Sequence, residues 1–149
     1  MFRRRDRDFD DVRAVIVAED DDTRPVELAL LRRIAAEAVI LQDDAEVLLR
    51  EIRDRGPLAD LAPRGGRLAS RFLALAAALP ASRDPLVRAY ASRLHEVLDH
   101  HALMLSASLD LLAVCARSER LEDEVDRIDG LGRPARWLED IRFELLVES

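Results

Sequence analysis

The sequence predicts an all-α fold, an antiparallel bundle of four to five helices, two of them long. Composition is the first indication, since 49% of the 149 residues are hydrophobic, 36% are charged and only 4% are aromatic. The second is that apolar residues recur at three- and four-residue steps over two long stretches. The third is that proline and glycine lie mainly between these stretches. We expect one helical-bundle domain over residues 25–149, preceded by a charged N-terminal arm over residues 1–24.

The arm interleaves charges of both signs, which is typical of a solvated segment. Its charged residues begin with Arg3, Arg4, Arg5, Asp6, Arg7 and Asp8 and end with the acidic run Glu19 to Asp22. Val12, Val15 and Ile16 fit either a short helix packed on the bundle or a lone β segment. No apolar run follows the basic start, and no stretch reaches about 18 uncharged residues, so neither a signal peptide nor a membrane span is expected.

The first long helix is predicted to begin at Thr23 and Pro25, which suit a cap and a first helical turn. Gly56 and Pro57 stop it after Arg55. Between these points an apolar seam follows a strict seven-residue repeat through Leu31, Ile34, Ala38, Leu41, Ala45, Leu48 and Ile52. Such a seam predicts packing along another long helix, for which only the helix beginning at Pro85 has a matching length.

Residues 57–66 are predicted to form a loop, with at most one helical turn over residues 58–62, because Pro57, Pro63, Gly65 and Gly66 crowd it. A shorter helix follows and ends at Pro80. Its predicted inward face consists of Leu68, Phe72, Leu75 and Leu79.

The second long helix is predicted over residues 85–117, capped by Ser82 or Asp84 and with Pro85 in its first turn. From Ala102 onward it is apolar nearly all round, which predicts a helix surrounded by partners. Beyond Arg117 the apolar face changes to Leu121, Val125 and Ile128. Either the helix breaks at Ser118, or its end swings out toward another partner. Because this face points away from the main seam and both helices are long for one small core, we predict a homodimer.

The C-terminal part is divided by Gly130-Leu131-Gly132, a predicted interruption. Pro134 then opens a last helix. Its predicted inward residues are Trp137, Leu138, Ile141 and Leu145.

Net charge and cysteine content limit the class of protein. The formal charge of −7 disfavours nucleic acids and anionic membranes as partners. Cys115 is the single cysteine, so a disulfide within the chain is excluded and a buried thiol in a reducing compartment is expected. All basic residues are arginine, which is typical of a G+C-rich genome. We therefore predict a bacterial cytoplasmic protein.

The three histidines share the second long helix but differ in position. Projection at 100° per residue places His95 with Ser92, Asp99 and Asp110 on a polar stripe opposite the core. A protein partner at this stripe is a further possibility. His101 projects toward the core, where Ser108, Tyr90 or a facing helix can bind it.

Candidate chemistry is confined to this stripe and its flank. The nine residues from Arg93 to His101 resemble the phosphoacceptor helix of histidine kinases of the nitrate-sensor and lipid-fluidity-sensor type. This resemblance implies that His95 accepts the phosphoryl group, that Glu96 is the base which activates its ring, and that His100 orients water for dephosphorylation. The family more often has aspartate where Glu96 stands. After the helical hairpin the sequence has no room for an ATP-binding domain, and it contains no asparagine of the kind that holds magnesium there. We therefore do not expect autophosphorylation.

The function predicted from the sequence is a small non-enzymatic helical interaction or assembly protein. The alternative is a phosphotransfer or kinase-docking bundle with His95, Glu96 and His100 as its candidate site. A second alternative is a metal-binding bundle using Glu96, His100 and Glu37 of the paired helix, although the chain has none of the Glu-x-x-His elements of di-iron bundles. Glycine-rich phosphate loops and nucleophile elbows are absent from the sequence, so no cofactor is predicted.

Overall fold

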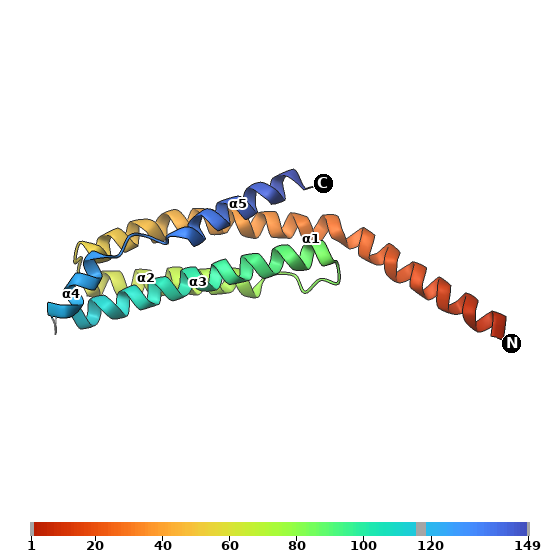
Figure 1. Ribbon diagram of the computed structural model, residues 1–149, viewed down its shortest axis with the longest axis horizontal. Coiled ribbons are helices and arrows are strands. Elements are labelled where there is room, and N and C mark those ends of the chain that lie inside the picture. Colours follow the sequence, from red (N-terminus) through yellow and green to blue (C-terminus); the bar gives the residue numbers. More distant parts are fainter. Residues whose placement is uncertain (1, 116–118, 149) are drawn as a thin grey trace.

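The computed structural model describes the backbone of residues 2–115 and 119–148, and the side chains of residues 23–115 and 121–148. It contains five helices, α1 (Phe2–Arg53), α2 (Leu58–Ala77), α3 (Pro85–Cys115), α4 (Glu119–Asp126) and α5 (Arg133–Val147). The helices α1, α2, α3 and α5 lie side by side, and α4 lies at one end, between α3 and α5 (Figure 1). Consecutive long helices run in opposite directions, so the prediction of an all-α antiparallel bundle is confirmed.

The seam of α1 is buried as the seven-residue repeat predicts. All seven predicted residues are in the core, together with Leu28, Ala35 and Leu49. The small residues Ala38 and Ala45 are fully buried, which permits close approach of the neighbouring helices. Among the described residues, α1 packs on α2 and α5 as well as on α3 and also touches α4, so the first long helix has four neighbours where one was expected.

The end of α1 has the hydrogen-bond pattern of a Schellman motif. The backbone N–H of Gly56 donates to the carbonyl of Glu51, and that of Arg55 donates to the carbonyl of Ile52. Arg55 is the residue with positive φ, at 60°, a conformation that glycine adopts without strain. The predicted stop at Gly56 is therefore correct in place, but Arg55 makes the left-handed turn.

The start predicted for α1 at Thr23 and Pro25 is wrong, because α1 begins at Phe2 and contains Pro25 in its interior. A helix can continue through proline at the cost of one backbone hydrogen bond and some bending. Figure 1 shows the N-terminal part of α1 extending well beyond the ends of the other helices. At 1.5 Å per residue, the whole helix is about 80 Å long.

The loop predicted over residues 57–66 is also wrong, because α2 begins at Leu58 and includes Pro63, Gly65 and Gly66. Gly65 is buried, and a Cβ atom there would lie 2.4 Å from the Leu109 side chain and 3.1 Å from the Leu48 side chain. This glycine therefore serves close packing of α2 on α3 and α1 rather than a turn. The predicted apolar face of α2 is confirmed, with Phe72 fully buried and its three leucines packed on the core.

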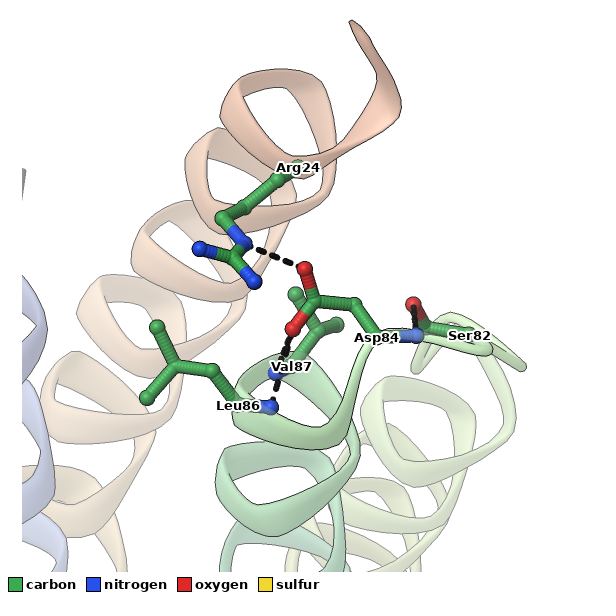
Figure 2. Close-up of polar contacts among 5 residues, drawn as sticks. All are labelled: Arg24, Ser82, Asp84, Leu86 and Val87. Atoms are coloured by element: carbon green, nitrogen blue, oxygen red, sulfur yellow. Dashed lines mark hydrogen bonds and ion pairs between the residues drawn. The ribbon is translucent and has the colours of Figure 1, made fainter. Parts of the chain in front are cut away.

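Asp84 caps α3, which confirms one of the two predicted caps (Figure 2). Its Oδ1 accepts hydrogen bonds from the N–H groups of Leu86 (2.9 Å) and Val87 (3.4 Å). The Ser82 hydroxyl accepts a bond from the N–H of Asp84 and so supports the cap. The other carboxylate oxygen of Asp84 is paired with the Arg24 guanidinium on α1. This pair holds the pKa of the buried Asp84 carboxyl below its ordinary value of 3.8, and the two backbone bonds act in the same direction.

Within the described residues, α3 is the one helix long and apolar enough by length and composition to cross a membrane, even though Asp110 interrupts it. The other four helices α1, α2, α4 and α5 all contact α3. Its second half was predicted to be surrounded by partners, and this is correct only in part. Leu103 and Val114 are 66% and 41% exposed, so one side of this apolar stretch faces outward.

Helix α3 is described to Cys115 and α4 from Glu119, and the predicted break at Ser118 falls outside the described residues. Val125 of α4 is fully buried, and Leu121 and Ile128 pack against the core. The apolar face of α4 is therefore packed on its own chain and does not support the predicted homodimer, which stays a prediction.

The interruption at residues 130–132 is confirmed, because both glycines there have positive φ and Leu131 is buried. The N–H of Leu131 donates to the Glu46 carboxylate of α1 at 3.1 Å. Leu138, Ile141 and Leu145 of α5 face the core as predicted. Trp137 does not, since 50% of it is exposed.

Candidate functional site

The polar stripe of α3 is exposed as predicted, and His95 lies in its middle. The His95 side chain is 57% exposed, and its Nδ1 lies 3.3 Å from the Asp99 carboxylate one helical turn later. A carboxylate beside Nδ1 favours the tautomer that carries the proton there, which leaves the lone pair on Nε2. The His95 ring is therefore exposed, with a carboxylate beside one of its two nitrogens.

The other two candidates on this helix are placed differently. Glu96 is exposed and His100 is half-buried, with its ring centroid 6.3 Å from that of His101. The described contact of His95 is with Asp99, not with Glu96. The sequence placed Asp99 on the same polar stripe as His95, four residues later. The four-residue spacing was the available signal that Asp99 orients the ring.

His101 is fully buried, as its projection predicted, and its partner lies on a facing helix. Its Nε2 lies 2.8 Å from the side-chain oxygen of Gln42 on α1, and the Gln42 amide nitrogen donates to the Ala135 carbonyl on α5. The ring also meets Phe72 of α2 edge-on at 5.3 Å. Burial lowers the pKa of His101 from 6.5 to about 4, with a smaller contribution from His100. His101 is thus a neutral core residue linking four helices.

Two polar contacts join α3 to the end of α5 near the stripe. Arg93 forms an ion pair with Glu144, and the Tyr90 hydroxyl donates to the Glu148 carboxylate at 3.0 Å. Burial and the neighbouring Glu148 carboxylate raise the pKa of Tyr90 above 10. These contacts hold α3, the helix that carries His95, against the end of α5. They also leave Arg93 paired with Glu144.

Metal-binding geometry is not formed by the predicted residues. Among the residues whose side chains are described, no group of three histidine, cysteine or acidic side chains is arranged to hold a metal ion. Glu37, Glu96 and His100 are therefore not brought together as a site. Cys115 is buried, and its thiol donates to the Leu112 carbonyl at 3.1 Å, which is a structural role.

Comparison with known proteins gives no significant match to a family model, to a curated protein or to a solved structure. The interpretation of the stripe therefore depends on its geometry and on the local resemblance of residues 93–101 to a phosphoacceptor helix.

Proposed function

We propose that the protein is a small helical interaction protein that associates with itself and has no catalytic activity of its own. One observation supports this above all: α1 extends far beyond the bundle that its second half helps to form (Figure 1). A helix without tertiary packing is only marginally stable in water, so such an extension gains most of its stability from a partner.

The outer side of α1 supports the same function. Val26, Ile40 and Val47 are exposed, and they are separated by 14 and 7 residues, which are multiples of the seven-residue repeat. Because residues separated by multiples of seven lie on one side of a helix, these three form a stripe along which a further helix can dock. Apolar residues scattered at random over the surface would not share this spacing.

Co-expression of two differently tagged copies tests self-association. We expect purification on one tag to recover the other copy in comparable amount after extensive washing. Recovery of the first copy alone, at every salt concentration tried, would contradict the proposal. A partner protein of different sequence would then be the remaining kind of interaction.

The second candidate function is phosphotransfer through His95, and the Asp99 contact is the observation that favours it. The Nε2 lone pair attacks phosphorus, the N–P bond forms, and the bond from phosphorus to the donor's leaving group breaks. The proton stays on Nδ1, and the Asp99 carboxylate 3.3 Å away stabilises the positive charge on the ring. We propose another phosphoprotein or a small acyl phosphate as the donor.

Incubation with acetyl phosphate, or with purified sensor kinases, tests this candidate by the appearance of acid-labile phosphate. We expect label on the wild type, its loss in His95→Ala, and slower labelling in Asp99→Asn than in Glu96→Gln. If His95→Ala keeps the label, the site assignment is wrong. If Glu96→Gln is labelled more slowly than Asp99→Asn, the base is Glu96, as the resemblance implies, and not Asp99.

A further inference from the structure

A groove between α1 and α2 is lined by the arginine side chains of α2. It has a volume of about 380 Å³, and it is lined by Asp44, Val47, Arg64, Arg67, Leu68 and Arg71. The helix α2 contains three arginines and a single acidic residue, Asp60, in a chain whose net charge is −7. The groove is therefore a local positive surface on a negatively charged protein.

Only one of the three arginines is paired among the described side chains. Arg64 contacts the carboxylates of Glu51 at 2.7 Å and Asp60 at 3.2 Å. Arg67 and Arg71 are exposed and have no ion pair or hydrogen bond with the described part of the chain. They lie four residues apart, one helical turn, so both guanidinium groups can bind carboxylates of one ligand.

Two of the six residues that line the groove are apolar, Val47 on α1 and Leu68 on α2. Ile40 and Leu75 lie outside this lining, seven residues from Val47 and Leu68 on the same two helices. Ile40 is 65% exposed and Leu75 is half-buried. Because α1 and α2 are antiparallel, both steps run in the same direction, and this spacing suits a helix laid along the two helices better than a small molecule.

The chain itself contains a helix of the complementary composition. Residues 8–22 include seven acidic residues and one arginine, with Phe9, Val12, Val15 and Ile16 between them. These residues belong to the part of α1 that extends beyond the bundle (Figure 1). Because α1 is continuous through Pro25, this segment points away from the groove of its own copy. Only the groove of another copy is within its reach.

We propose that residues 8–22 of one copy dock in the groove between α1 and α2 of a second copy, with their carboxylates opposite Arg67 and Arg71. This inference rests on the proposed self-association and names the contact that causes it. Reciprocal exchange of the two segments closes a twofold-symmetric dimer with two identical contacts. The groove is then complete only in the dimer.

Charge reversal on each side of the contact tests the proposal. One variant carries Arg67→Glu and Arg71→Glu, and the other carries Asp20→Arg, Asp21→Arg and Asp22→Arg. We expect the dimer dissociation constant of each variant alone to rise at least about tenfold, because like charges then face one another. Mixing the two variants restores attraction at both contacts, so the mixture is expected to form the dimer again. Restoration also shows that both variants are folded.

Arg133→Glu with Arg136→Glu is the matched control. These two α5 arginines are exposed, have no ion pair or hydrogen bond among the described residues, and give the same change in net charge. We expect this control to dimerise as the wild type does. If the Arg67 and Arg71 variant also keeps the wild-type constant within about twofold, the docking site is overturned while self-association stands. A wild-type chain that is monomeric overturns both proposals.

Discussion

The Nε2 atom of His101 on α3 lies 2.8 Å from the side-chain oxygen of Gln42 on α1. The Gln42 amide nitrogen donates to Ala135, so its oxygen faces the ring, and Nε2 must carry the proton. The other ring nitrogen, Nδ1, is buried and has no hydrogen-bond partner among the residues that the structure describes. A charged imidazole would leave a second N–H group unsatisfied in the core, which explains why burial disfavours protonation.

This arrangement predicts a pH-dependent stability. The pKa of His101 is 6.5 when exposed and about 4 in the folded protein, so the unfolded chain binds the proton more readily. Stability is expected to be full above pH 6.5, and to fall by up to about 3 kcal/mol as the pH decreases to about 4. Urea denaturation at several pH values measures this slope. His101→Gln should flatten it, whereas the exposed His95→Gln should leave it unchanged.

The Asp84 cap predicts a graded response to substitution. Asp84→Ala removes the acceptor for two backbone N–H groups and the partner of Arg24, so we expect a loss of about 2 kcal/mol. Asp84→Asn keeps a good capping acceptor and loses only the charge, and it should cost about 1 kcal/mol or less because Arg24 is partly exposed. Thermal unfolding distinguishes them. Equal losses would mean that the charge, not the cap, is what matters.

Acid should act on Asp84 in a separate pH range from His101. The folded pKa of Asp84 is below 3.8, so its contribution is fully present above that pH and is lost as the pH falls further. Wild type and Asp84→Asn should therefore show parallel stability curves between pH 4 and 6.5 and converge only in stronger acid. Divergence that begins near pH 6 would contradict the assignment of that range to His101.

The seam of α1 shows what the sequence could predict. Leu31 to Ile52 repeat without a fault, and burial of an unbroken apolar stripe is the strongest term in helix packing. Single prolines and glycines predicted the helix ends less well. Pro25 and Gly65 indicate breaks when viewed alone, but both lie inside helices. At Gly65 the close packing of α2 on α3 and α1 outweighs the cost of a glycine within the helix.

Two features could not be predicted from local sequence patterns, namely the exposure of Trp137 and the contact between Gln42 and His101. Trp137 lies three residues after Pro134 and four before Ile141, so periodicity could not separate it from the buried face of α5. Gln42 lies four residues after Ala38 and three before Ala45, which placed it at the edge of the seam. Its bond to His101 spans 59 positions, and no local pattern identifies such a pair.

Replacing two glycines by alanine is expected to change the stability of the protein in opposite directions. Gly130 has φ of 75°, and a Cβ atom there would lie 2.2 Å from the Glu46 carboxylate, so Gly130→Ala should destabilise by about 1–3 kcal/mol. Gly66 lies inside α2 with nothing within 4 Å of its Cβ position. Gly66→Ala should therefore stabilise by about 0.5–1 kcal/mol. Chemical denaturation measures both, and the reverse order would refute the assigned backbone geometry.

Glycine and alanine at position 55 are expected to give proteins of different stability. Its side chain binds the Asp126 carboxylate at 3.0 Å and the Glu122 carbonyl at 2.9 Å, and both variants lose these contacts. Glycine relieves the positive φ of 60° and alanine does not. Arg55→Gly should therefore be more stable than Arg55→Ala by about 1 kcal/mol. Equal stability in denaturant titrations would argue against a left-handed residue at this position.

The molar mass of the full chain in solution tests the central claim of self-association most directly. Multi-angle light scattering at tens of micromolar, in a buffer of physiological ionic strength, should give twice the chain mass of 16.8 kDa. A single species of 16.8 kDa across the concentration range would contradict the proposal.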